Sequence, residues 1–183
     1  GAVAASLFIP GIARADTKRK KPNFLFVFAD EWRAQATGYN GDPNLQGMTP
    51  NLDKLASESL NFVNSITVCP LCSPARGALL TGLAPNQTKV SSNGCHLDQK
   101  YVTIGDAFKD AGYQTGYVGK WHLQGDQKTD FIPPAEHQGF DYWKVLECTH
   151  NYNNSNYYEG DDPTLRKWPE YDDGWPFHSP VGT

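Results

Sequence analysis

Apolar residues along the chain form either short continuous runs or helix-spaced faces. The run NFLFVFA at residues 23–29 is continuously apolar, which is typical of a strand buried on both faces of a parallel sheet. Further strands are predicted at 114–118 and, more briefly, at 61–63. Because these strands alternate with helices, the pattern indicates an α/β fold with a mostly parallel central sheet flanked by helices.

Capping residues predict where the helices start and stop. Thr49 precedes Pro50, and Ser73 precedes Pro74, so each pair is expected to supply an N-cap with proline at the first helical position. The second of these helices should end at Gly82. A third helix should be capped by Thr103. The apolar residues expected to face inward from the first and third helices are Leu52, Leu55, Ala56, Leu60, Ile104, Ala107, Phe108 and Ala111.

From about residue 125 onward the chain is polar, aromatic and rich in Asn, Asp and Pro. Few periodic signals occur there, so long loops with short elements are expected. A length of 183 residues suits one domain with a real core. The net charge of −4 provides no global basic field that would favour nucleic acid.

The N-terminal run AVAASLFIPGIARA is apolar and ends in Ala13-Arg14-Ala15, which fits an A-x-A cleavage pattern. It is too short for a comfortable membrane span. We therefore predict that residues 1–21 are a residual signal peptide and basic linker, and that 22–183 form the domain. A periplasmic or secreted protein follows from this interpretation; the alternative is a disordered or expression-derived leader.

Residues that could take part in catalysis or binding lie next to the ends of the predicted strands and helices. Asp30 and Glu31 follow the first strand, Lys120 and His122 follow the strand at 114–118, and Cys72 lies just before a helix. In open α/β sheets, ligands bind beyond the carboxyl ends of the strands. We therefore expect these side chains at one edge of the sheet.

The residue types at this edge suit an anion, a metal and a nucleophile. Adjacent carboxylates are ligands for hard cations such as Ca²⁺ or Mg²⁺. A cysteine at a helix N-terminus, with Arg76 in reach, has surroundings that activate a nucleophile. Lys120 and His122, two apart on an extended segment, are expected to hold one anion together. Each motif alone is also compatible with an ordinary surface loop.

The cysteines leave other interpretations open. Cys72 and Cys69 have the C-x-x-C spacing of a small disulfide loop or of half a zinc site. The remaining zinc ligands would have to come from Cys95 with His96, or from Cys148 with His150, and neither pair has the usual spacing. Residue composition does not decide between these alternatives.

Several motifs in order resemble one family. The stretch CSPARGALLTG, from Cys72 to Gly82, resembles the C-x-P-x-R signature of the type I, formylglycine-dependent sulfatases. PNFLFVFAD at 22–30, TPNLDKLASES at 49–59 and GYQTGYVGKWHL at 112–123 resemble that family's first strand, next helix and second signature. The resemblance covers about residues 22–145. It implies an alkaline-phosphatase-like sandwich, present here in its N-terminal part.

The resemblance also implies roles for individual residues. Cys72 would be oxidised by a maturation enzyme to formylglycine, whose hydrate attacks sulfur and later expels sulfate. Asp30 and the oxygen at position 72 would bind Ca²⁺ or Mg²⁺, with Glu31 standing where many members have Asp. Arg76 would hold the hydrated aldehyde. Lys120 and His122 would bind sulfate oxygens.

The family is considerably longer than this chain and takes further metal ligands from its second half. The expected function is therefore sulfate ester hydrolysis by a longer protein of which this chain is an N-terminal piece. The Asn- and Tyr-rich stretch at 147–161 suggests a sulfated carbohydrate as substrate, and His150 and Asn93 are further pocket candidates. The alternatives are a phosphate or phosphonate ester hydrolase of the same superfamily, and an inactive truncated exported domain.

Overall fold

A computed structural model describes residues 21–125, 131–150 and 155–167. The expected residual signal peptide, apart from its last residue, lies outside these ranges. The helices are α1 (Pro50–Glu58), α2 (Cys72–Thr81), α3 (Pro85–Thr88), α4 (Ile104–Asp110) and the 3-10 helix η1 (Pro134–Glu136); the strands are β1 (Gly116–Lys120), β2 (Tyr142–Leu146), β3 (Asn156–Glu159) and β4 (Asp162–Lys167).

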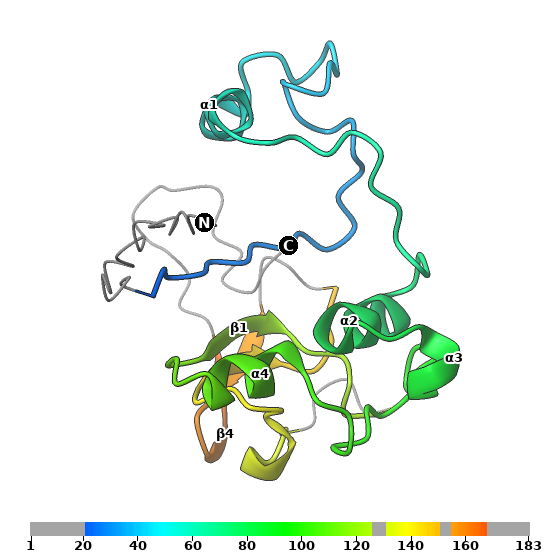
Figure 1. Cartoon of the computed structure of the whole chain (residues 1–183), viewed down its shortest axis with the longest axis vertical. Coiled ribbons are helices and arrows are strands. Elements are labelled where there is room, and N and C mark those ends of the chain that lie inside the picture. The colour runs from blue at the N-terminus through cyan, green and yellow to red at the C-terminus, as the bar shows by residue number, and fades with distance from the viewer. Residues whose placement is uncertain (1–20, 126–130, 151–154, 168–183) are drawn as a thin grey trace, which may run out of the picture.

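The strands form one mixed sheet in the order β1-β2-β3-β4 (Figure 1). β1 and β2 are parallel, and Lys120 lies opposite Leu146 at their carboxyl ends. β2 pairs with β3, and β3 with β4, in antiparallel fashion. The fold is thus α/β as expected. The parallel pair brings the residues that follow β1 and β2 to one edge.

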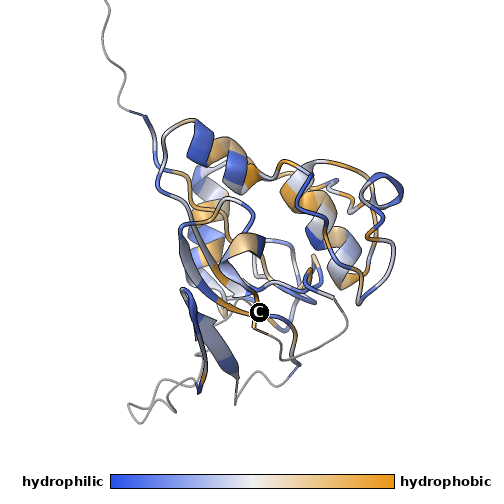
Figure 2. Ribbon diagram, turned by 90° about the horizontal axis from the view of Figure 1, so that it is seen from below, coloured by the Kyte–Doolittle hydropathy of each residue, from blue (hydrophilic) through white to orange (hydrophobic). Residues whose placement is uncertain are grey.

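The hydrophobic core lies where the parallel strands and the segments that follow them meet α2 and the loop after α3. Its fully buried members are Leu80, Val90, Leu97, Trp121, Leu123, Ile132, Trp143 and Val145. Tyr117 and Phe140 pack against this cluster. Figure 2 shows that the helices carry both apolar and polar residues.

The predicted strand at 23–29 does not form. These residues have no strand structure, and Phe24, Leu25 and Val27 are 64%, 90% and 81% exposed. The Phe24 ring instead contacts the rings of Phe108 and Tyr113. A continuous apolar run favours burial, but a strand also needs a neighbouring strand for its backbone hydrogen bonds, and in the described sheet the only strand that pairs with β1 is β2. The short strand expected at 61–63 does not form either.

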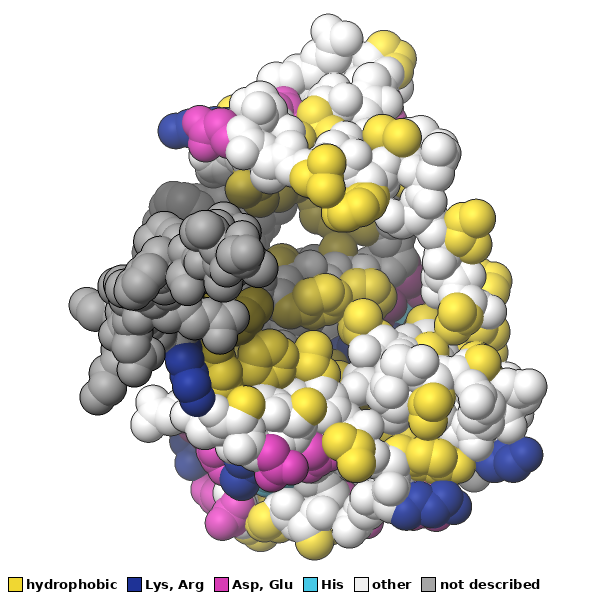
Figure 3. Space-filling view, in the orientation of Figure 1, with side chains coloured by type: hydrophobic (Ala, Val, Ile, Leu, Met, Phe, Trp, Pro, Cys, Tyr) yellow, Lys and Arg dark blue, Asp and Glu magenta, His cyan; other side chains and the backbone are white. Residues whose placement is uncertain are grey.

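Helix α1 begins at Pro50 as predicted, but its apolar face is not buried. Leu52, Leu55 and Leu60 are all exposed, and α1 has no buried residue. Figure 1 shows why: α1 lies on a long excursion of the chain, away from the sheet and the other helices. Figure 3 shows hydrophobic side chains on both sides of the opening between that excursion and the main body.

Helix α2 begins earlier than its proline predicted. Leu71 is the N-cap and Cys72 the first helical residue, so Ser73 is inside the helix and is not its cap. Pro74 is tolerated there because a residue in the first turn has no intrahelical acceptor for its N–H. Gly82 ends the helix with a φ of 69°, as expected.

Helix α4 has the predicted cap but presents another face. The Thr103 hydroxyl accepts a hydrogen bond from the Asp106 amide, and the Asp106 carboxylate accepts one from the Thr103 amide. The buried residue of α4 is Gly105; Ile104 and Ala107 are exposed. A Cβ at Gly105 would lie 2.5 Å from the Gln138 carbonyl oxygen. Close backbone packing, which only glycine permits, therefore decides which face is inside.

The remaining boundaries differ moderately from expectation. The strand expected at 114–118 occurs as β1, two residues later. In the described residues after 125, where long loops with short elements were expected, three short strands form: β2, β3 and β4. Antiparallel pairing of β3 and β4 satisfies their backbone groups although β4 is exposed, and this does not require an apolar pattern.

Candidate active site

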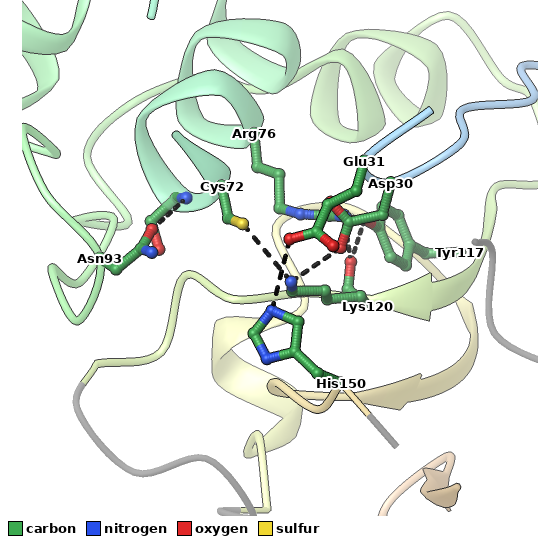
Figure 4. Close-up of polar contacts among 9 residues, drawn as sticks. Asp30, Glu31, Cys72, Arg76, Asn93, Tyr117, Lys120 and His150 are labelled. Atoms are coloured by element: carbon green, nitrogen blue, oxygen red, sulfur yellow. Dashed lines mark hydrogen bonds and ion pairs between the residues drawn. The ribbon is translucent and has the colours of Figure 1, made fainter. Parts of the chain in front are cut away.

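Cys72 lies at the N-terminus of α2, where backbone amides point away from the helix. The positive end of the helix dipole favours negative charge beside this position. The Ser73 amide donates a hydrogen bond of 3.0 Å to the Asn93 side-chain oxygen (Figure 4). Asn93, from the loop between α3 and α4, thus anchors the first turn of the helix that carries Cys72.

Lys120 joins Cys72 to Asp30. Its ammonium lies 2.7 Å from Asp30 Oδ2 and 3.5 Å from the Cys72 sulfur (Figure 4). Lys120 is the last residue of β1, and Gly119 before it has a φ of 131°, a conformation that favours glycine. The three side chains predicted to share one edge therefore meet, although Asp30 follows a segment that is not a strand.

Arg76 completes this cluster from the second turn of α2. Its guanidinium lies 3.5 Å from Asp30 Oδ2 and donates hydrogen bonds to the Lys120 carbonyl oxygen at 2.5 Å and to the Tyr117 hydroxyl at 3.3 Å. The Tyr117 hydroxyl also donates to the Lys120 carbonyl oxygen, at 2.7 Å. Among the described residues the buried Arg76 Nε has no partner.

Charge pairing keeps both partners of the central ion pair ionised. Burial raises the pKa of Asp30, but the Lys120 hydrogen bond and the charges of Lys120 and Arg76 outweigh it, so this pKa lies below its usual value. Burial lowers the pKa of Lys120, but the hydrogen bond and the charge of Asp30 outweigh this effect, so the pKa of Lys120 lies above its usual value. Lys120 is therefore a cation beside the Cys72 sulfur.

His122 follows β1 by two residues and is also buried. Its φ of 56° shows that the chain is not extended here, so the expected shared face of Lys120 and His122 does not arise from strand alternation. Burial, with the charges of Lys120 and Arg76, lowers the pKa of His122 to about 4. Its Nδ1 is buried and, among the described residues, has no partner.

The two adjacent carboxylates do not converge. Asp30 faces Lys120 and Arg76, whereas Glu31, with a φ of 55°, is exposed and lies 3.6 Å from His150 Nε2. In the described ranges no group of three His, Cys, Asp or Glu side chains is placed to hold a metal ion. The described residues by themselves therefore do not fit a divalent cation.

The structure bears on the two other interpretations of the cysteines, a disulfide and a zinc site. Cys69, Cys72, Cys95 and Cys148 all lie in the described ranges, and no disulfide joins any two of them. The zinc arrangement, too, has no group of three suitable ligands within those ranges.

Two residues that organise the site carried no clear sequence signal of this role. Tyr117 holds Arg76 and the end of β1 together, and Asn93 anchors the start of α2. Asn93 was a pocket candidate, but its side chain serves the helix N-terminus. His150 was the other, and it reaches the site through Glu31. Tyr117 looked like an ordinary strand residue.

The cluster is suited to an anion held against position 72. Lys120 supplies a cation, α2 supplies its positive end, and Arg76 Nε and His122 Nδ1 are buried nitrogens that, in the described part of the chain, have no partner. Buried polar atoms are normally paired in proteins, so two of them at one site indicate a missing ligand or water.

Comparison with known proteins decides the family. The sulfatase family profile matches residues 22–174. The chain belongs to the sulfatase family. This sulfatase chain is 45% identical over 151 residues to an ulvan-active sulfatase of Formosa agariphila, covering 82% of this chain and 29% of that protein. It is 33% identical over 142 residues to an N-acetylglucosamine-6-O-sulfatase of Bacteroides thetaiotaomicron, covering 78% and 23%.

Solved structures agree with the sequence relatives. A structure in complex with its substrate, D-glucosamine-2-N,6-O-disulfate, has a TM-score of 0.68 and 30% identity, covering 81% of this sulfatase chain and 28% of that chain. The alkaline-phosphatase-like fold expected from the motifs is confirmed by such neighbours. The chain spans less than a third of the length of these curated relatives.

Proposed function

We propose that the protein of which this chain is the N-terminal part hydrolyses sulfate esters at the site built around Cys72. The observation that carries the proposal is the contact of Lys120 with both Asp30 and the Cys72 sulfur at the N-terminus of α2. Three segments far apart in the sequence converge there, and they place positive charge around a position suited to a nucleophile.

The nucleophile is proposed to be a formylglycine made from Cys72 by a maturation enzyme. Sulfatases generally use a formylglycine and a divalent metal. When present, the hydrated aldehyde supplies an oxygen nucleophile at position 72 and a second hydroxyl through which sulfate leaves. The net reaction breaks the S–O bond of the ester with water and releases the alcohol.

The residues of this chain would bind and orient the reacting groups. Arg76, whose Nε has no partner among the described residues, and Lys120 would bind the oxygens at position 72 and on the sulfate. His122 is neutral at neutral pH, because its pKa is about 4, and offers a ring N–H to a sulfate oxygen. Charge that develops on those oxygens in the transition state is thereby stabilised.

The cation is proposed to be Ca²⁺ or Mg²⁺, with Asp30 and the oxygen at position 72 as ligands and Glu31 as a further candidate. Asp30 is now neutralised by Lys120 and Arg76, and its neighbour Glu31 points to His150. Further ligands must come from outside the described residues.

The proposed substrate is a sulfated carbohydrate outside the cytoplasm. Relatives include an ulvan-active sulfatase and an N-acetylglucosamine-6-O-sulfatase, both bacterial. The apolar run ending in Ala13-Arg14-Ala15 supports export to the periplasm or beyond. No helix in the described ranges is long and apolar enough to cross a membrane.

Paired substrates test the proposed reaction. The full-length protein is produced together with a formylglycine-generating enzyme and assayed with an aryl sulfate and the matching aryl phosphate, with Cys72→Ala as control. We expect sulfate hydrolysis that the control abolishes, and a peptide mass showing an aldehyde at position 72. Preferential phosphate hydrolysis would favour the phosphate ester alternative. An aldehyde without any turnover would favour the inactive domain.

A further inference from the structure

Glu147 is a buried carboxylate that the proposed reaction does not use. It is the first residue after β2, only 1% of it is exposed, and it lies beside the carboxyl end of the parallel strand β1. A buried charged group is costly unless it is paired or hydrogen-bonded. A residue of this kind therefore needs a structural or functional reason.

The carboxylate of Glu147 accepts hydrogen bonds from the loop that follows β1. Its Oε1 accepts from the Gln124 amide at 2.9 Å and from the Gly125 amide at 3.3 Å. Burial raises the pKa of Glu147 to about 7, while the backbone amides of residues 122–125 oppose that rise. Two consecutive amides thus donate to one side-chain oxygen.

This loop carries His122 in a conformation that needs support. The φ of His122 is 56°, a left-handed value that is unfavourable for a non-glycine residue because its Cβ crowds the following carbonyl oxygen. Two other contacts hold the loop: the Trp121 amide donates to the Leu146 carbonyl oxygen, and the Leu97 amide to that of Leu123. Glu147 fixes the last part of the loop by accepting hydrogen bonds from the Gln124 and Gly125 amides. The start of the loop, its middle and its end are then all fixed.

We propose that Glu147 is a positioning residue that fixes the loop at 122–125 and thereby holds the His122 imidazole toward the anion site. The role of His122 in binding sulfate rests on the proposed function; the placement of its ring does not. The important property of Glu147 is the reach of its acceptor oxygen. A side chain whose acceptor oxygen is equally far from the backbone of residue 147 should hold the loop equally well, whereas a shorter acid should not.

Two variants separate reach from charge. Glu147→Gln keeps an acceptor oxygen at the same reach without the charge, and Glu147→Asp keeps the charge but withdraws the oxygen by one methylene. We expect amide hydrogen exchange at Gln124 and Gly125 to be close to wild type in E147Q and about tenfold faster in E147D, because a hydrogen bond is lost. The His122 ring signals in NMR spectra should move in E147D only.

Titration of the ¹⁵N-labelled full-length protein with inorganic sulfate adds a functional measurement. E147D should weaken sulfate binding about fivefold or more, and E147Q should bind within about twofold of wild type. Val145→Ala is the matched control: Val145 is fully buried in β2, in the same core as Leu123, so its truncation destabilises the core but removes no hydrogen bond of the loop. V145A should leave the His122 signals and sulfate affinity unchanged.

The opposite ranking overturns the proposal. If E147D behaves as wild type and E147Q does not, charge matters and reach does not. If V145A moves the His122 signals as much as E147D, Glu147 acts only through overall stability. If wild type does not bind sulfate while exchange and ring signals follow the expected ranking, the proposed function loses support and the positioning role stands.

Discussion

The Lys120 ammonium lies 2.7 Å from the Asp30 carboxylate, although 90 residues separate them in the chain. This contact joins a segment without regular structure to the carboxyl end of β1. Both side chains are more than nine-tenths buried. The same ammonium reaches the Cys72 sulfur, so the ion pair orients the cation that faces the position of the nucleophile.

Removing the charge of Asp30 should destabilise the protein. Asp30→Asn leaves Lys120 and Arg76 as neighbouring buried cations, so we expect a loss of about 2–3 kcal/mol in the free energy of unfolding. Urea denaturation at pH 7 measures it. Asp98→Asn, which removes an exposed pair with Lys100, is the control and should leave stability close to wild type. Equal effects of both variants would contradict the importance of the buried pair.

Removing the Tyr117 hydroxyl should loosen Arg76 without disturbing the core. The phenyl ring of Tyr117→Phe can still pack against Trp121, Trp143 and Phe140. The lost hydrogen bonds to Arg76 and to the Lys120 carbonyl oxygen should cost about 1–2 kcal/mol of stability.

The assay of aryl sulfate hydrolysis in the full-length protein provides the functional measurement. Y117F should lower kcat/KM about tenfold, which corresponds to one such hydrogen bond. Tyr142→Phe is the matched control, because Tyr142 is exposed on β2. A Y117F variant as active as Y142F would show that Arg76 does not need this support.

His122 should make the protein less stable in acid. Its folded pKa is lowered from 6.5 to about 4 by burial and by the charges of Lys120 and Arg76; Asp30 raises it and His150 lowers it further. The unfolded chain therefore binds the proton more readily. The contribution of His122 to the free energy of unfolding is full above pH 6.5 and is lost as pH falls through about 4. After allowance for solvent screening, this contribution is about 2 kcal/mol.

His122→Asn cannot be protonated and should remove this part of the pH dependence. Denaturation curves between pH 4 and 7.5 for wild type and H122N measure the difference. NMR titration of the His122 ring checks its pKa directly. A ring that titrates near 6.5 would contradict the expected burial.

Glu147 should make the free energy of unfolding change with pH in the direction opposite to that of His122. Its pKa is raised from 4.5 to about 7, so the folded protein holds the proton more readily than the unfolded chain. Stability from this group is present below pH 4.5 and is lost as pH rises through 7, by about 3 kcal/mol in total. The difference in unfolding free energy between wild type and E147Q should therefore fall over this range. A difference that is constant with pH would show that Glu147 does not titrate there.

Local signals predicted some elements well. Thr103 with Asp106 makes a capping box from neighbouring residues, and Pro50 starts α1, because both effects act within one helical turn. The run at 23–29 misled for a physical reason: its apolar character records a need for burial and does not specify which strand pairs with it. Strands β3 and β4 were missed because antiparallel pairing, and not an apolar pattern, stabilises them.

The sequence alone determined the family, through CSPAR at 72–76 and GKWH at 119–122, and it identified Asp30, Cys72, Arg76 and Lys120 as partners. Short motifs indicate the chemistry of a site because that chemistry depends on the types of residue in the motif. Only the tertiary structure decided that Asp30 pairs with Lys120, that the Tyr117 hydroxyl contacts Arg76 and that Glu147 accepts hydrogen bonds from the loop after β1. These contacts join residues far apart in the chain, and their geometry depends on how β1, β2 and α2 pack.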